Sequence, residues 1–240
     1  MLILSLDSSA IAGSVALCDC ERLLCEYTVN LGNTHSETLL PMIESILKLS
    51  GYTADDIDIF ACSEGPGSFT GIRIGAATIK GLAFSTDKPC IGVSTLEALA
   101  YNLRGFDGII CPVMNARRAQ VYNAVFDKDL NRLTEDRAIA AKDLAEELKK
   151  YGEKVFLCGD GTRVALDGGV DAIAAPERLL HQSGYSVAQC ALKKFNEGET
   201  ASDIELSPVY LRLPQAERAR LEKISGSIES NERILNNETH

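Results

Sequence analysis

The stretch Ser63–Gly81, SEGPGSFTGIRIGAATIKG, constrains the fold more than any other part of the chain. Gly67, Gly71 and Gly75 fall four residues apart and Thr78 follows three residues later, so one face of a helix formed here is nearly bare. Glycine inside a helix costs about 1 kcal/mol relative to alanine, which predicts that another backbone approaches this face closely. Spacing alone leaves open whether that backbone belongs to the same chain or to a second one.

A phosphate site is the second interpretation of this glycine block. The turn Gly65-Pro66-Gly67 lies between a predicted strand and a predicted helix, where backbone N–H groups and the helix dipole suit an anion. Neither G-x-x-x-x-G-K-[ST] nor G-x-G-x-x-G is present, however, and Lys80 lies far down the helix. The block therefore favours close packing, with the amphipathic helix before it as the nearest companion in the chain.

Length, charge and cysteine content limit the classes of protein that fit. The 240 residues are 45% hydrophobic, enough for one large domain or two small ones. A formal charge of −10 argues against unaided binding to a phosphate backbone, so an RNA substrate would be held by a partner. The eight cysteines lie mostly in apolar runs without a C-x-x-C pair, which favours buried thiols in a reducing cytoplasm over a metal site. We expect no signal peptide and no membrane segment.

Hydrophobic periodicity predicts two α/β units followed by a polar tail. For the first unit, alternation and apolar runs predict strands at Leu2–Leu6, Ser14–Cys18, Leu23–Val29, Ile57–Cys62 and Cys90–Val93, with helices at His35–Leu49, at Phe69–Ser85 and from Ser94 onward. For the second unit, the pattern predicts strands at Ile109–Met114, Gln120–Phe126 and Lys154–Cys158, with helices at Lys142–Lys150 and Ser186–Phe195. We expect domains at 1–104 and 105–213, and a polar helix or disordered tail at 214–240.

Six blocks together resemble one protein family. They are LDSS, HSETLLP, SEGPGSFTGIRIGAATIKGLA, IGVSTLEALA, NARRAQVY and PVYLR. They are similar to the TsaB family, bacterial partner proteins in threonylcarbamoyladenosine modification of tRNA. The resemblance covers most of the first 125 residues and returns at Pro208–Arg212, and the GPGSFTGIRIG block is its most specific part. The family pattern usually has aspartate where this chain has Asn115, which puts a charge-dependent role there in doubt.

The resemblance implies an actin-like, sugar-kinase-like (ASKHA) α/β fold with two domains, the second truncated. It implies a non-catalytic subunit that binds the catalytic protein TsaD, with the ATPase TsaE as a further partner, a homodimer in isolation, and contact with tRNA only through the complex. The partner interface would lie on the helices 35–49 and 69–85, at His35, Leu39, Ile43, Ile46, Gly71, Ile72, Gly75 and Ile79. A vestigial nucleotide loop would consist of Asp7, Ser8, Ser9, Gly159, Asp160 and Gly161.

Catalysis is not expected, and neither a cofactor nor a metal is. The H-x-x-x-H metal pair of the catalytic relative would fall on Thr95 and Leu99, and leucine cannot coordinate a metal. We expect His35 to cap or start its helix, Asp7 to end the first strand and Asp160 to shape a turn. The alternative from another class is a small ATP-dependent phosphotransferase that uses Asp7 and Asp160. A metalloprotease is a third alternative.

Overall fold

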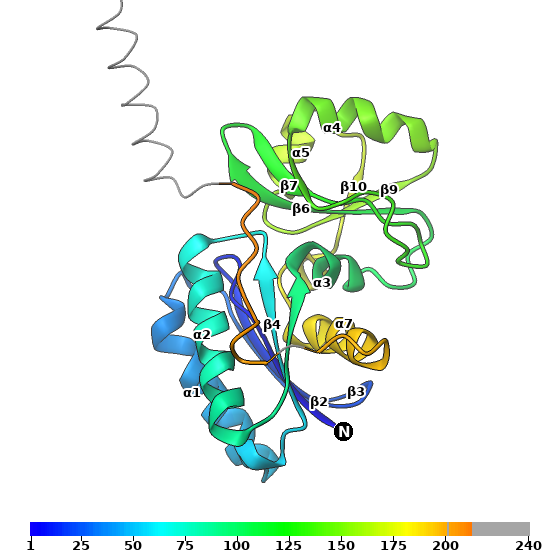
Figure 1. The fold of residues 1–240 in the computed structure, drawn as a ribbon. Helices are drawn as coiled ribbons and strands as arrows, with labels where there is room; N and C mark the ends of the chain where they lie inside the picture. Colours follow the sequence, from blue (N-terminus) through cyan, green and yellow to red (C-terminus); the bar gives the residue numbers. More distant parts are fainter. Residues whose placement is uncertain (201, 213–240) are drawn as a thin grey trace, which may run out of the picture. The chain divides into compact units, whose positions relative to one another are not determined.

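The computed structural model describes residues 1–200 and 202–212 of the chain, and Met1–Val209 form one compact unit within it (Figure 1). This unit contains two five-stranded sheets. The α/β fold expected for an actin-like, sugar-kinase-like protein is therefore confirmed. Among the described residues, no helix is both long and apolar enough to span a bilayer.

The first sheet has the order β3-β2-β1-β4-β5. Its strands are β1 (Leu2–Asp7), β2 (Gly13–Asp19), β3 (Arg22–Val29), β4 (Ile59–Gly65) and β5 (Cys90–Ser94). Its helices are α1 (His35–Ser50), α2 (Phe69–Thr86) and α3 (Thr95–Tyr101), with a 3₁₀ turn at Ala54–Asp56. β1 pairs with β2 antiparallel and with β4 parallel. Each predicted element of this half is present, with bounds shifted by three residues at most.

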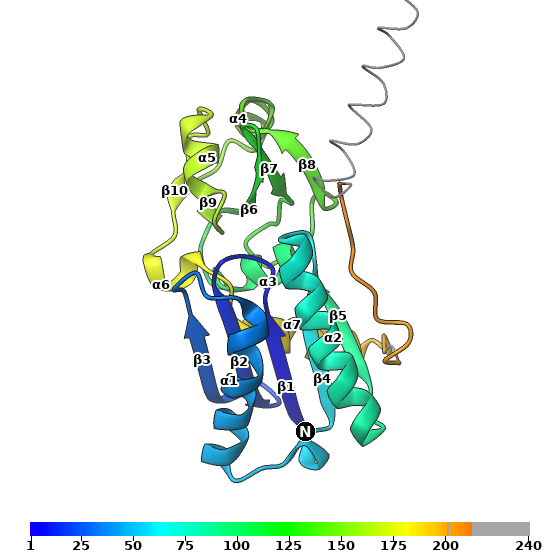
Figure 2. The ribbon, with the colours of Figure 1, turned by 90° about the vertical axis from the view of Figure 1, so that its left-hand side faces the viewer.

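Alternation along the strands places helices on both faces of the first sheet. Leu4 and Leu6 of β1 contact the core formed with α1 and α2, while Ile3 lies in the cluster that contains Val187 and Ala191 of α7 (Gly184–Asn196). Because successive strand residues point to opposite faces, β1 contributes side chains to the hydrophobic cores on both faces of the sheet. Figure 2 shows α1 and α2 side by side on one face, with α7 behind. Lys194 of α7 also donates a hydrogen bond to a backbone carbonyl of β5, 2.9 Å away.

The second sheet has the order β10-β9-β6-β7-β8. Its strands are β6 (Ile109–Arg117), β7 (Gln120–Asn123), β8 (Arg137–Ala140), β9 (Val155–Cys158) and β10 (Ile173–Ala174). The helices after β8 are α4 (Ala141–Leu148), α5 (Thr162–Asp167) and α6 (Glu177–Leu180), with a 3₁₀ turn at Lys149–Tyr151. The domain boundaries at 104/105 and 213/214 stay predictions, and the tail expected at 214–240 lies outside the described residues.

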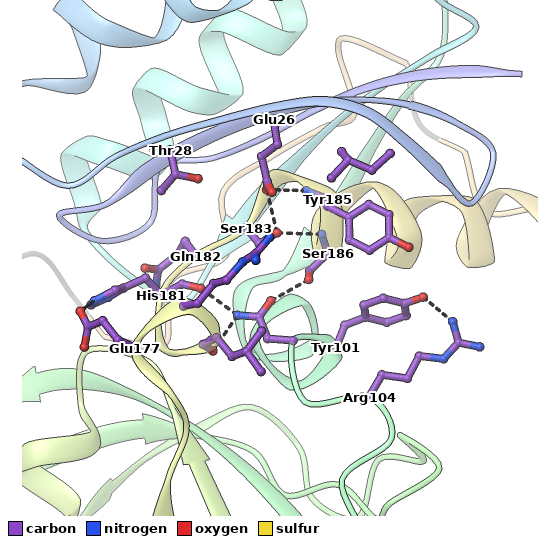
Figure 3. Close-up of a pocket in the computed structure, with 14 residues that line it drawn as sticks. Glu26, Thr28, Tyr101, Arg104, Glu177, His181, Gln182, Ser183, Tyr185 and Ser186 are labelled. Carbon is purple, nitrogen blue, oxygen red and sulfur yellow. Dashed lines mark hydrogen bonds and ion pairs between the residues drawn. The ribbon is translucent and has the colours of Figure 1, made fainter.

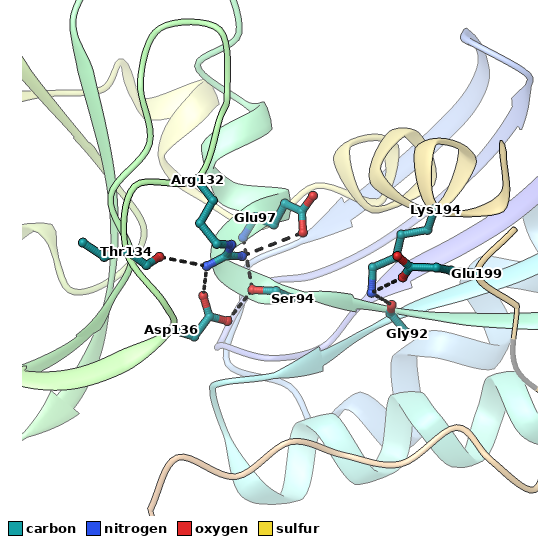
Figure 4. Close-up of polar contacts among 8 residues, drawn as sticks. All are labelled: Gly92, Ser94, Glu97, Arg132, Thr134, Asp136, Lys194 and Glu199. Atoms are coloured by element: carbon teal, nitrogen blue, oxygen red, sulfur yellow. Dashed lines mark hydrogen bonds and ion pairs between the residues drawn. The ribbon is translucent and has the colours of Figure 1, made fainter. Parts of the chain in front are cut away.

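The helix α3 contacts both halves of the compact unit. Its apolar residues Leu96 and Leu99 share a buried cluster with Met114 and Phe126. At its start, the hydroxyl of Ser94 donates to Asp136, 2.5 Å away, and Arg132 lies 3.8 Å from Glu97 while pairing with Asp136 (Figure 4). The loop before β8 is thus held against α3 by apolar and polar contacts together.

Candidate functional site: the serine loop and the two-helix face

The glycine block packs against the loop that follows β1, residues Asp7–Ala12, which we call the serine loop. The amide of Ser68 donates to the carbonyl of Ser9 at 2.6 Å, and the hydroxyl of Ser8 donates to the carbonyl of Gly71 at 2.9 Å. A Cβ atom built at Gly71 would lie 2.0 Å from the Ser8 carbonyl oxygen. One at Gly67 would lie 2.4 Å from the Ser9 carbonyl oxygen. The backbone that approaches the bare face is therefore the chain's own, and the expectation of a foreign helix at these glycines is wrong.

His35 fastens the start of α1 to the same loop. Its Nε2 lies 2.7 Å from the carbonyl oxygen of Ala10, so this nitrogen carries the proton and donates. The ring also fills space beside Gly71, where an added Cβ would come within 3.2 Å of it. His35 is the first residue of α1, and Thr34 takes the N-cap position. The serine loop thus contacts the first turns of both α1 and α2.

Most of the residues predicted for a partner interface lie in the interior of this chain. The exposed fraction of the side chains is 2% or less at Leu39, Ile43, Ile46, Ile72 and Ile79. Gly71 and Gly75 are also buried. Except for Leu39, which also lines the groove described next, these residues face the core of this chain, so this part of the prediction is corrected. The apolar periodicity that identified them marks the face of each helix that packs on the sheet.

The outer faces of α1 and α2 instead form an apolar groove of about 480 Å³, which we call the helix groove. Residues lining it are His35, Ser36, Leu39, Leu40, Ile74, Ala77, Thr78, Gly81 and Leu82. Leu40 is 51% exposed, and an added Cβ at Gly81 would meet no atom of the described residues within 4 Å beyond its own turn of helix. Phe84, 77% exposed, follows Ala77 by seven residues and so lies on the same stripe of α2. The signal in the sequence was an apolar residue outside the buried stripe, such as Leu40 directly after Leu39.

Asp7 is buried at the end of β1 with one oxygen satisfied and one not. Its Oδ1 accepts hydrogen bonds from the amide and the hydroxyl of Ser9, at 2.8 and 2.6 Å. Its Oδ2 has no hydrogen-bond partner among the described residues. Burial raises the pKa of the Asp7 carboxyl above its usual range, and the two Ser9 hydrogen bonds act in the opposite direction. The expectation that Asp7 ends the first strand is confirmed.

We predict that Asp7→Asn stabilises the chain at pH 8 and that this gain shrinks as the pH falls toward 4. The raised folded-state pKa means that the native state holds the proton more tightly than the unfolded chain does. The associated stability is present at low pH and is lost as the pH rises through the folded pKa. Asparagine keeps the Oδ1 acceptor for Ser9 and removes the ionisation. Urea unfolding of both proteins across this pH range measures the difference; a gain independent of pH would contradict the prediction.

Near the ends of the neighbouring strands β4 and β5 lie two buried hydroxyl groups that, like Asp7 Oδ2, lack a hydrogen-bond partner among the described residues. Ser63 lies beside Asp7, since Leu6 pairs with Cys62, and Thr95 begins α3 just after β5. The side-chain oxygens of Ser63 and Thr95 are buried without a hydrogen-bond partner in the described part of the chain. A buried hydroxyl left unpaired costs about 1–3 kcal/mol.

A matched pair of threonine substitutions tests whether the unpaired hydroxyl of Thr95 destabilises the fold. Thr95→Val is expected to raise the free energy of unfolding by about 1 kcal/mol, because it removes an unpaired hydroxyl and keeps the shape. Thr162→Val is expected to lower it by about 1 kcal/mol, because the Thr162 hydroxyl donates to the carbonyl of Gly159 at 2.8 Å. Both threonines are buried and both are the first residue of a helix, so propensity effects cancel. Equal signs for the two changes in chemical denaturation would refute the assignment.

The second predicted loop, Gly159-Asp160-Gly161, packs against the tip of the β6–β7 hairpin. An Oδ1 atom of Asp160 accepts a hydrogen bond from the amide of Asn115 at 2.9 Å. The side-chain oxygen of Asn115 accepts in turn from the amide of Arg117 at 2.8 Å. An aspartate at 115 would bring a second carboxylate next to Asp160, so the neutral amide supplies the acceptor without repulsion. Asp160 shapes this turn, as expected.

Leu99, on which one residue of the relative's metal pair would fall, and the histidines other than His35 are engaged in other contacts or lie outside the described residues. Leu99 is 1% exposed within the apolar cluster around α3. His181 pairs with Glu177 at 3.1 Å, and His240 lies outside the described residues. In residues 1–200 and 202–212, no group of three or more His, Cys, Asp and Glu side chains is placed to hold a metal ion. The cysteines of these ranges are free thiols, mostly buried as expected.

The structure is thus a two-sheet α/β protein in which the glycine residues of α2 pack against the serine loop. The apolar helix groove on α1 and α2 faces outward. Residues 30–219 match the family model described as TsaD, tRNA N6-adenosine threonylcarbamoyltransferase. The chain is 32% identical over 226 residues to the tRNA threonylcarbamoyladenosine biosynthesis protein TsaB of Bacillus subtilis, with 92% of this chain and 99% of that protein covered. The chain therefore belongs to the TsaD-like family, and the B. subtilis TsaB protein matches it over almost its whole length.

Other relatives agree with this assignment. TsaB of Escherichia coli is 30% identical over 220 residues, which cover 88% of this chain and 95% of that protein. A Pseudomonas aeruginosa structure described as similar to peptidase YEAZ superposes with a TM-score of 0.78 at 27% identity, covering 88% of this chain and 99% of that one. The tRNA N6-adenosine threonylcarbamoyltransferase of Burkholderia pseudomallei is 34% identical, but over only 113 residues, 33% of its length. The family expected from the sequence blocks is confirmed.

Proposed function

We propose that this chain takes part in tRNA threonylcarbamoyladenosine biosynthesis as a non-catalytic subunit. It binds a TsaD-like enzyme through the helix groove and holds that enzyme in its active arrangement, during threonylcarbamoylation of adenosine 37 in tRNAs that read codons starting with A. A TsaE-like ATPase is a further partner. The observation that carries the proposal is the exposed apolar surface of α1 and α2, where Leu40 and Phe84 are left uncovered by the part of the chain that the structure describes.

The groove is suited to helical partners. Small residues at Ala77 and Gly81 let a second backbone approach α2, and Leu40 and Leu82 supply apolar contacts on either side. Two helices from the partner laid against α1 and α2 would complete a four-helix bundle. Differential binding to the competent conformation of the partner then shifts its population. In the absence of the enzyme, the same face suits an isologous homodimer.

Charge supports an indirect contact with tRNA. The net charge of −10 disfavours binding to a phosphate backbone by this chain alone. Support for a non-catalytic role comes from Thr95 and Leu99, which stand at the positions of the metal pair in the resemblance and are both buried. The name of the B. subtilis relative supports the pathway.

Reconstitution tests the proposal. The chain is mixed with the TsaD-like enzyme from the same source, association is measured by sedimentation, and modified tRNA is measured by mass spectrometry. We expect a stable heterocomplex, no modification by this chain alone, and strong stimulation when both are present with the ATPase, tRNA and a donor of the threonylcarbamoyl group. Modification by the isolated chain, or failure of the two proteins to associate, would overturn it.

A further inference from the structure

A second concave site lies across the sheet from the helix groove, on the side covered by α7 (Figure 3). We call it the tyrosine pocket. It has a volume of about 740 Å³, within the range of sites for small ligands. Its walls come from β3, the end of α3, α6 and the start of α7. The residues that carry the argument are Glu26, Tyr101, Arg104, Arg178, Gln182 and Tyr185. The proposed partner-binding function uses none of them.

The half-buried part of the wall carries a carboxylate that is already engaged. Glu26 accepts hydrogen bonds from the hydroxyl of Ser183 at 2.8 Å and from the amide of Tyr185 at 3.1 Å. This carboxylate caps the first turn of α7, so the positive end of that helix is occupied. An anionic group placed there would be repelled. The buried part of the pocket therefore accepts a neutral group.

Gln182 offers that neutral group an unused donor and acceptor. The residue is 3% exposed and lines the pocket, and neither its amide nitrogen nor its amide oxygen has a hydrogen-bond partner among the described residues. A buried amide left unpaired on both atoms is costly and calls for a complementary partner. A nucleobase edge presents a matching donor and acceptor to a glutamine side chain.

Two aromatic rings and two guanidinium groups complete the site. Tyr101 and Tyr185 meet edge to face with their centroids 6.2 Å apart, and Arg104 lies 5.6 Å from the Tyr101 ring while donating to its hydroxyl at 2.8 Å. Flat aromatic walls suit a planar ring. Arg104 and Arg178 are both exposed at the solvent side of the pocket, where the exposed Glu177 is the acidic residue of the lining. Arginine binds phosphate through paired N–H groups.

We propose that the tyrosine pocket binds a nucleotide, with its base against the tyrosines and Gln182 and its phosphate at Arg104 and Arg178. An apolar ligand would leave the Gln182 amide unpaired, and an anion entering first would meet Glu26. The same chemistry is presented by a free mononucleotide and by an unpaired nucleotide in an RNA strand. The proposal stands independently of the helix groove, which lies on the other face of the first sheet.

Equilibrium binding of the full chain to adenosine, to AMP and to a single-stranded pentaadenylate tests the proposal. We expect saturable binding of AMP, about tenfold tighter than that of adenosine. The double substitution Arg104→Gln with Arg178→Gln is expected to remove this preference for AMP. Gln182→Leu is expected to weaken AMP and adenosine equally. Tighter binding of the oligonucleotide identifies RNA as the source, and tighter binding of AMP identifies the free nucleotide.

The control is Arg163→Gln, an exposed arginine on α5 paired with Asp167, which is expected to leave every affinity unchanged. Thermal unfolding shows whether each variant is folded, and Gln182→Leu is expected to unfold at a temperature no lower than the parent chain, because it removes an unpaired buried amide. Absence of saturable binding of all three probes by the parent chain would overturn the proposal. So would an unchanged AMP preference in the folded double variant. Neither result would affect the heterocomplex test.

Discussion

Gly71→Ala is expected to lower the free energy of unfolding by about 3 kcal/mol, whereas Gly81→Ala, ten residues along the same helix, is expected to raise it by about 1 kcal/mol. At Gly71 an added methyl group would lie 2.0 Å from the carbonyl oxygen of Ser8, a backbone atom that cannot move without shifting the serine loop. At Gly81 the methyl group meets no atom within 4 Å beyond its own helix turn, among the residues that the structure describes, and only improves helix propensity. Urea unfolding of the isolated chain followed by circular dichroism measures both.

The opposite signs make this pair informative. If α2 glycines served a foreign helix alone, both substitutions would stabilise the isolated chain. Equal stabilisation would therefore contradict the contact between the glycine block and the serine loop. Ser8→Ala in the Gly71→Ala background is a further check: the Ser8 contact at Gly71 is made by the carbonyl oxygen, so removing the hydroxyl is not expected to restore stability.

Leu40→Glu is expected to weaken association with the TsaD-like enzyme at least 30-fold, which is about 2 kcal/mol of binding free energy. Leu40 lines the helix groove and is 51% exposed, so a glutamate there is tolerated by the folded chain. In a closed helix bundle the carboxylate would be taken out of water without a partner charge. Titration calorimetry or sedimentation with the purified enzyme gives the affinity, and tRNA modification is expected to fall with it.

Ile173→Glu is the matched control for this prediction. Ile173 is also an aliphatic residue that is 51% exposed, but it lies in β10, the edge strand of the second sheet. It receives the same added charge at the same exposure. Unchanged affinity for Ile173→Glu together with a loss for Leu40→Glu assigns the groove as the interface. Equal effects of the two changes would refute that assignment.

The strands and helices of the first sheet could be predicted from the sequence because local hydrophobic patterns determine them. Alternating residues such as Ile3 and Leu4 feed two cores, and the spacing of Leu39, Ile43 and Ile46 defines the buried stripe of α1. The backbone that packs against the glycine face of α2 could not be predicted in this way. Spacing shows that a helix face is bare, but what fills it depends on how β1 and α2 come together, here through residues more than 60 positions apart.

The candidate interface illustrates the same limit. Periodicity ranks the most apolar stripe first, so it selected Ile72 and Ile79, which the sheet covers. Leu40 directly follows the buried Leu39, and Phe84 follows Leu82 and Ala83, so the local pattern does not show which of these apolar side chains stay exposed. Their exposure became visible only once both helices were packed. The tyrosine pocket had no sequence signal, since β3, α3 and the start of α7 supply its walls from positions 23 to 186.

The return of α7 to the first sheet has a consequence for biosynthesis on the ribosome. Val187, Ala188 and Ala191 cover the side of that sheet opposite α1 and α2. When a growing chain has emerged only as far as α3, the strands β1 to β5 are present but Ile3, Ile59 and Ile91 on that side face water. The apolar surface on that side of the N-terminal half is thus covered by α7 only after about ninety more residues have been synthesised.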